Sequence, residues 1–131
     1  MALKNREKRR NPRFFFTLKR GISTQLIKSG NNSTPIPATL LSLSEGGVSL
    51  SLDRHYLSQI QEGDQFVLNS NEKNEPVNSL SGTQIEIKHI QNYHIYVNAS
   101  CGGEFTEIPA DNRDRIQVWL KHRLETGIKE N

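Results

Sequence analysis

The chain contains 131 residues, of which 34% are hydrophobic, and its formal net charge is +3. This length suits a single domain with a modest core, and no apolar run approaches the roughly 20 residues that cross a bilayer. The basic N-terminus lacks the apolar stretch of a secretory signal. A single cysteine, Cys101, cannot form an internal disulfide, so the sequence favours a reducing compartment, the cytoplasm.

The positive charge is concentrated at the N-terminus. Lys and Arg number 17 in the whole chain, and eight of them lie in the first twenty positions: Lys4, Arg6, Lys8, Arg9, Arg10, Arg13, Lys19 and Arg20. Glu7 is the one acidic residue there, and the remainder of the chain is mildly acidic. This uneven distribution predicts an anionic partner for the N-terminal segment.

Residues 1–12 are predicted to form a flexible basic arm, in which Pro12 restricts the preceding residue to extended conformations. Residues 13–28 are rich in aromatic and β-branched side chains and are predicted to form one long strand, bent at Gly21. The folded domain is therefore expected to cover residues 13–127.

A second strand is predicted over residues 36–44, after a cluster of turn residues. Because alternate residues of a strand share a face, Leu40, Ser42 and Ser44 are expected to point to the same side.

Four more strands follow at spacings typical of hairpins, over residues 48–52, 65–70, 83–90 and 94–100. A short helical turn over 55–64 and a polar loop over 71–82 are predicted to connect them. Six short strands with such connections favour an antiparallel sheet closed into a barrel.

The C-terminal segment has a helical period instead. Asp111 is the expected N-cap and Gly127 the expected end of the helix. The apolar stripe that should dock this helix on the barrel comprises Ile116, Trp119, Leu120 and Leu124. The predicted fold is mainly β: a six-stranded antiparallel β-barrel with a C-terminal amphipathic α-helix and a flexible basic N-terminal arm.

The arm contains an RxxxR pattern. Arg9 and Arg13 supply it in the stretch RRNPR, with Arg10 between them. Arg6 and Arg10 have the same spacing, but the first pair is preferred because Arg13 lies where the first predicted strand begins. An arginine fork can bind both acceptors on one edge of guanine, and phosphate oxygens can take its remaining donors.

A second pattern lies in SLSEGG, which contains Ser42, Ser44 and Gly47. The adjacent Gly46 and Gly47 suit a tight turn with positive φ, and they leave room for a ligand near the backbone. In this order the two patterns resemble the signature of the PilZ family, the bacterial receptors of cyclic di-GMP, in which [D/N]xSxxG follows RxxxR. The segment CGGEF and the helix after it also look like the closing strand and helix of that family.

The resemblance implies a non-enzymatic receptor that needs no cofactor and takes cyclic di-GMP as its ligand. The ligand-binding residues that it implies are Arg9, Arg10, Arg13, Ser42, Ser44 and Gly47. It also implies that a loose arm becomes ordered around the ligand and signals to a downstream effector protein, in control of motility, biofilm or exopolysaccharide. No residue identifies that partner.

Ser42 departs from the family pattern, which has Asp or Asn at this position to contact a guanine edge. A carboxylate can accept from two guanine donors at once, whereas a serine hydroxyl accepts from one. Losing one such contact costs about 1–3 kcal/mol, or roughly 5- to 150-fold in affinity. Weaker binding is therefore expected.

Two alternatives remain open. The chain is either a degenerate member of the family that acts as an adaptor without binding nucleotide, or a small β-barrel that binds single-stranded nucleic acid through its arm. The second is disfavoured because the chain has few aromatic residues for base stacking beyond residues 14–16. The four histidines lack metal-ligand spacing, and no Gly-rich phosphate loop is present, so neither a metal site nor an enzyme is expected.

Overall fold

The structure, a computed structural model, describes five segments of the chain: residues 12–16, 22–28, 34–70, 77–92 and 97–126. The predicted arm over residues 1–12 lies outside them, apart from Pro12. Within these segments, no helix has the length and apolar character needed to cross a membrane.

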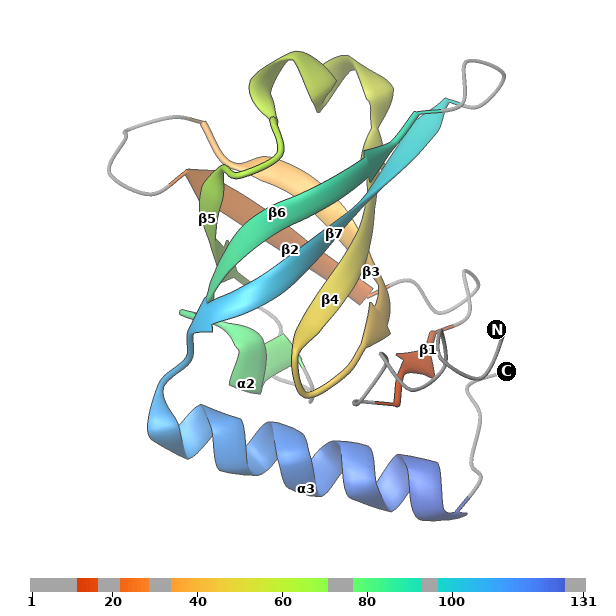
Figure 1. The fold of residues 1–131 in the computed structure, drawn as a ribbon, viewed down its shortest axis with the longest axis vertical. Coiled ribbons are helices and arrows are strands. Elements are labelled where there is room, and N and C mark those ends of the chain that lie inside the picture. Colours follow the sequence, from red (N-terminus) through yellow and green to blue (C-terminus); the bar gives the residue numbers. More distant parts are fainter. Residues whose placement is uncertain (1–11, 17–21, 29–33, 71–76, 93–96, 127–131) are drawn as a thin grey trace, which may run out of the picture.

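Six antiparallel strands close into a barrel (Figure 1). They are β2 (Ile22–Lys28), β3 (Ile36–Leu43), β4 (Gly47–Asp53), β5 (Gln65–Asn69), β6 (Gln84–Gln91) and β7 (Asn98–Glu107). Their order around the barrel is β3-β2-β5-β6-β7-β4, and β4 pairs back with β3. The predicted six-stranded antiparallel barrel is therefore confirmed.

The prediction of one strand over residues 13–28 is wrong. The segment contains two strands, β1 (Phe14–Phe15) and β2, which pair with the same strand, β3. β1 pairs with the end of β3 at Leu43, whereas β2 pairs with its first part, up to Leu40. Phe15 lies opposite Ser42 and Ile22 lies opposite Leu40, so seven steps along this segment correspond to two along β3, which a continuous strand could not do. Gly21, where a bend was expected, lies outside the described residues.

The last strand is also longer than expected. β7 begins at Asn98 and continues through CGGEF to Glu107, whereas the sequence predicted a strand over 94–100. Residues 94–96 lie outside the described segments. Short helices occupy two of the connections: a 3-10 helix at Arg54–Gln59, and α2 (Val77–Leu80) in the predicted polar loop.

The barrel interior is filled by alternate side chains of every strand, as its small size requires. In β4, Val48, Leu50 and Leu52 are buried, and the serines between them are partly exposed. The largest fully buried hydrophobic side chains of the core are Phe66, Leu26, Leu43, Leu50, Leu68, Ile85, Ile87 and Ile116. This alternation in β4 was visible in the sequence.

Helix α3 (Ala110–Thr126) lies across one end of the barrel (Figure 1). Ile116 and Leu120 are buried there and Trp119 is partly buried, as the apolar stripe predicted, whereas Leu124 at the end of the stripe is exposed. The prediction of Asp111 as the N-cap is wrong, because the helix already begins at Ala110. The backbone N–H of Arg113 accordingly donates to the carbonyl of Pro109. Asp111 lies in the first turn instead, where its negative charge still favours the helix N-terminus.

Trp119 joins α3 to the short strand β1. Its ring is 5.2 Å from that of Phe14, edge to face, and 5.8 Å from that of Phe16, nearly stacked. The guanidinium of Arg123 lies 5.0 Å from the centre of the indole ring, which is a cation–π contact. The contacts of Phe14 and Phe16 with Trp119 of the helix thus hold the segment that follows Arg13 against the barrel.

We expect Trp119→Ala to lower the free energy of unfolding by about 3 kcal/mol, because it removes a large ring from this cluster. The adjacent Val118 is 69% exposed, so Val118→Ala should change it by less than about 0.5 kcal/mol. Urea unfolding followed by circular dichroism measures both values. Equal effects of the two substitutions would contradict the described role of Trp119.

Candidate functional site

The turn after β3 is built around Ser44. The Ser44 backbone N–H donates to the carbonyl of Gly47 at 2.9 Å, and the Ser44 hydroxyl lies 3.4 Å from the same oxygen. The Ser44 Oγ also accepts from the backbone N–H of Gly46 at 3.2 Å. Ser44 is buried, and its hydroxyl bonds within the turn. In this arrangement Ser44 fixes the shape of the turn.

Gly47 is needed for a different reason from the one expected. Among the described residues, positive φ occurs at Gly63 and Gly82, so the expectation of positive φ at Gly46 and Gly47 is wrong. Instead, a Cβ built on Gly47 would overlap the carbonyl oxygen of Gly103 on β7. The two backbones approach so closely that only glycine fits at this position.

The expectation that Leu40 and Ser42 share a face of β3 is wrong. The register with β4 shifts between these two residues, which inserts one extra residue as a β-bulge. Leu40 lies opposite Leu50 in the core, whereas Ser42 lies opposite Ser49, which is partly exposed on the outer face. The bulge therefore turns the motif outward.

Ser42 itself is fully buried in spite of that orientation. Its hydroxyl oxygen is 2.6 Å from that of Ser49, which makes a hydrogen bond between the two strands. A direct contact of Ser42 with a ligand stays a prediction, because it requires this covered hydroxyl to become accessible. Ser49, which the sequence analysis did not single out, is the more accessible hydroxyl of the pair.

Arg13 is the one predicted site arginine among the described residues; Arg9 and Arg10 lie outside them. Arg13 directly precedes β1 and is partly buried, and its Nε is buried without a hydrogen-bond partner. In β1, Phe15 lies opposite Ser42. The structure therefore brings the end of the RxxxR pattern beside the serine–glycine pattern, although about thirty residues separate them in the sequence.

Directly opposite residues form one row across five strands on the outer face of the barrel. From β1 to β6 the row contains Phe15, Ser42, Ser49, Gly102 and His89. Phe15 is 62% exposed, unlike its neighbours in the Phe14–Phe16 run, which pack under the helix. Because alternate residues of a strand share a face, the sequence could have indicated that Phe15 points away from the core when Phe14 and Phe16 point into it.

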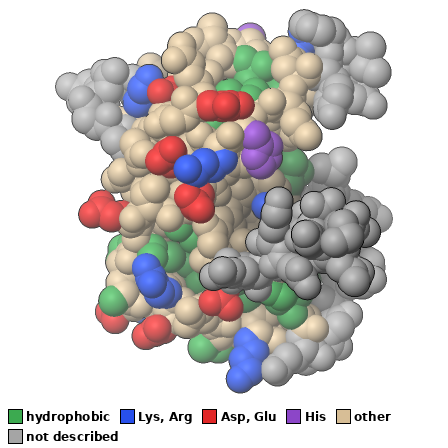
Figure 2. All heavy atoms as spheres, in the orientation of Figure 1, with side chains coloured by type: hydrophobic (Ala, Val, Ile, Leu, Met, Phe, Trp, Pro, Cys, Tyr) green, Lys and Arg blue, Asp and Glu red, His purple; other side chains and the backbone are tan. Residues whose placement is uncertain are grey.

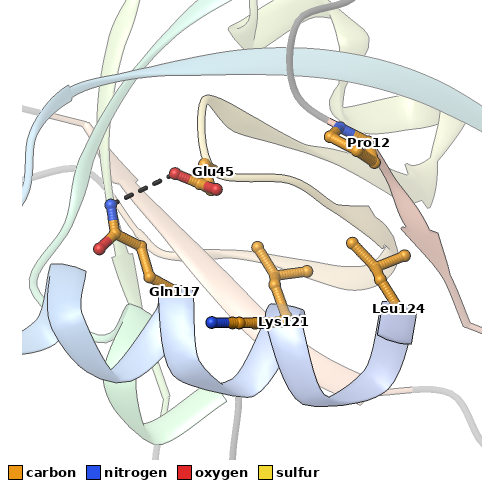
Figure 3. Close-up of a pocket in the computed structure, with 6 residues that line it drawn as sticks. Pro12, Glu45, Gln117, Lys121 and Leu124 are labelled. Atoms are coloured by element: carbon orange, nitrogen blue, oxygen red, sulfur yellow. Dashed lines mark hydrogen bonds between the residues drawn. The ribbon is translucent and has the colours of Figure 1, made fainter. Parts of the chain in front are cut away.

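A cavity of about 450 Å³ lies between α3 and the turn after β3 (Figure 3). Its lining residues are Pro12, Glu45, Gln117, Leu120, Lys121 and Leu124. Across it, the side-chain amide of Gln117 donates to the carboxylate of Glu45 at 3.2 Å. This bond ties the turn to the helix that also holds β1, so both sequence patterns are connected to α3.

Acidic and basic side chains are intermixed over β6 and β7 (Figure 2). The ammonium of Lys88 is 3.2 Å from the carboxylate of Glu86 and 3.5 Å from that of Glu104. The hydrogen bond that Lys88 donates to Glu86, together with the negative charges of Glu86 and Glu104, raises the pKa of Lys88. This part of the face therefore carries mixed charge and is not uniformly basic.

The described residues contain no group of three or more metal-binding side chains. The buried thiol of Cys101 is equally unsuited to chemistry, because burial raises its pKa to about 12. A thiol with such a pKa is almost entirely protonated at neutral pH and is a poor nucleophile.

The family model of the PilZ domain matches residues 7–122. The chain belongs to the PilZ domain family. This family consists of receptor domains that bind cyclic di-GMP and are not enzymes. The match extends from the basic arm through the barrel and most of α3.

Several solved structures share the fold. The PilZ domain of Escherichia coli YcgR with c-di-GMP is 16% identical with a TM-score of 0.65, and the alignment covers 92% of this chain and 98% of that one. MrkH of K. pneumonia, in complex with c-di-GMP, is 18% identical with a TM-score of 0.67; 91% of this chain and 54% of MrkH are covered. The Bacillus subtilis inhibitor of motility, MotI/DgrA, is 17% identical with a TM-score of 0.64, and the alignment covers 89% of this chain and 52% of that one.

The chain thus corresponds to nearly all of the YcgR domain but to about half of MrkH and MotI. No curated protein is significantly similar to the chain in sequence.

We expect Gly47→Ala to lower the free energy of unfolding by about 1–3 kcal/mol, because its Cβ would overlap backbone atoms of Gly103 that cannot move alone. Gly103→Ala is the matched comparison, since there the near atoms belong to a side chain and not to the backbone, with Ile85 Cδ1 at 2.7 Å and Ile85 Cβ at 3.2 Å. Thermal or urea unfolding ranks the two variants. A larger loss in Gly103→Ala would refute the close approach at Gly47.

Proposed function

We propose that this chain is a receptor of cyclic di-GMP, which it binds on the outer face of the barrel under the arginine arm. The proposal rests mainly on one observation: β1 pairs with β3 so that the residues after Arg13 lie beside Ser42 and the turn to Gly47. Two patterns that resemble one ligand signature are thereby adjacent. The YcgR and MrkH structures, whose titles name c-di-GMP, support the choice of ligand.

In this proposal Arg9, Arg10 and Arg13 bind guanine edges and phosphates. Guanidinium groups suit both, because they form paired hydrogen bonds with the O6 and N7 of guanine and charge-assisted bonds with phosphate oxygens. Ser44 and Gly47 shape the turn that the ligand contacts, and the hydroxyl of Ser42 or its partner Ser49 supplies a polar contact. The partly buried Arg13, with its unpaired Nε, begins the contact surface at β1.

Signalling in this proposal passes through α3. Ligand binding orders the arm beside β1, and Trp119 and Gln117 connect β1 and the turn with the helix. A change in the position of β1 or of the turn then alters the surface that α3 presents to an effector protein. The cellular process that the receptor controls is one of those that the family suggests, such as motility or biofilm formation. The buried free thiol of Cys101 suits a cytoplasmic protein.

Isothermal titration with cyclic di-GMP should show saturable binding that is lost in the Arg9→Ala/Arg13→Ala variant. Each lost charge-assisted bond costs about 1.5–3 kcal/mol, so the pair should lower affinity at least a hundredfold. The matched control is Arg113→Ala/Arg115→Ala, which removes the same charge from exposed positions of α3.

The same titration separates the nucleic-acid alternative. If the arm binds single-stranded nucleic acid, affinity for oligonucleotides should rise with length and fall steeply with salt. A wild-type protein that neither releases heat nor gains thermal stability with cyclic di-GMP would overturn the receptor proposal and favour the adaptor.

Ser42→Asp tests whether the departure from the family pattern limits affinity. We expect the carboxylate to accept from two guanine donors and to increase affinity roughly 5- to 150-fold. Ser51→Asp, on the outer face of the neighbouring strand, is the control for added negative charge. An unchanged or lower affinity in a variant that keeps its thermal stability would show that position 42 does not contact the base.

A further inference from the structure

On β6 and β7, an aromatic side chain lies against bare backbone. His89 of β6 and Gly102 of β7 are directly opposite each other. A Cβ built on Gly102 would overlap the imidazole of His89, whose Cε1 is the nearest atom. The ring therefore occupies space that any other residue at position 102 would fill. Gly102 is buried, whereas His89 is exposed to solvent.

This pair belongs to the same row as the signature serine. Gly102 lies opposite Ser49, and Ser49 lies opposite Ser42, to which it is hydrogen bonded. Directly opposite residues of antiparallel strands project from the same face. Neighbouring strands are about 4.8 Å apart, so three spacings separate His89 from Ser42 by roughly 14 Å. Within the row, a serine and a glycine lie between them, and the ring of His89 lies over the glycine, so that Ser49 is the residue between the ring and Ser42.

In this part of β6, the ring of His89 is the side chain best suited to contact a base. The neighbouring Lys88 pairs with Glu86 and Glu104, which occupies its ammonium group. His89 projects outward because the register between β6 and β7 shifts between Ile87 and His89. This second bulge, like the one in β3, places the end of the row on the outer face.

We propose that the nucleotide surface continues across β4 and β7 to β6, where the imidazole of His89 stacks on a guanine of the ligand. This inference rests on the proposed function. Flat side chains, histidine included, bind nucleobases by stacking on their faces. The ring of His89 lies over Gly102 but is exposed to solvent, and the small side chain of Ser49 beside it leaves a base access to the ring. Arg13, which directly precedes β1, lies toward the other end of the row.

Titration of cyclic di-GMP into His89→Ala, His89→Phe and the wild-type protein tests this role. Loss of a stacking ring should weaken binding roughly 5- to 150-fold, and His89→Phe, which keeps a flat ring, should restore most of the affinity. His55→Ala is the control, because His55 is exposed on the 3-10 helix and does not belong to the row.

A spectroscopic readout accompanies the titration. Stacking on a purine should shift the Cε1–H resonance of His89 upfield on addition of ligand, and the resonance of His55 should not move. Affinity in His89→Ala equal to that of the wild type would overturn this inference, whether or not the variant loses thermal stability. If Arg9→Ala/Arg13→Ala still loses binding in that case, the receptor proposal stands. If the wild type does not bind at all, both fall.

Discussion

The pairing of β3 on both of its edges is the constraint on which the rest of the structure depends. On one edge β3 pairs with β1 and β2, and on the other it pairs with β4, which closes the barrel. A closed barrel leaves no free edge, so the position of each strand is fixed by both neighbours. The bulge near the end of β3 then has one outcome: Leu40 stays in the core while Ser42 turns to the outside. The bulge thus places Ser42 on the outer face of β3, where its hydroxyl is hydrogen bonded to that of Ser49.

Close packing against neighbouring atoms, more than turn geometry, explains the glycines of β4 and β7. Gly47 is pressed against the Gly103 carbonyl, Gly103 against Ile85, and Gly102 against the ring of His89. None of the three has positive φ, so their value lies in the missing side chain. Gly103 makes room for Ile85 in the core, whereas Gly102 lets the ring of His89 lie against the outer face, toward the small side chain of Ser49.

The sequence predicted those elements in which local pattern and final environment agree. The alternation of Val48, Leu50 and Leu52 matches a strand with one buried face, and the spacing of Ile116 and Leu120 matches a helix with one buried stripe. These features depend only on neighbours in the sequence. The order of the two signature patterns was equally local, so their residues could be named without a structure.

What the sequence could not predict depends on register. In IPATLLSL nothing marks the extra residue that reverses the faces of β3, because leucine and serine suit either side of a partly covered strand. The division of residues 13–28 into two strands is likewise set by where each pairs with β3. The meeting of His89 with Gly102 also follows from a register shift. A shift of one residue reverses which side chains face the core, so such contacts appear only once the pairing is known.

The connection of both patterns to α3 determines what a ligand can change. A ligand shifts a conformational equilibrium only as far as it binds one arrangement better than the other. The Trp119 cluster and the bond from Gln117 to Glu45 join the helix to β1 and to the turn through two separate contacts. In the proposed receptor, an arm ordered beside β1 would act on a helix that the turn already restrains. With differential binding of about 3 kcal/mol, the ratio of two helix arrangements would change roughly 150-fold. The exposed side chains of α3, Val118 among them, would carry that change to a partner.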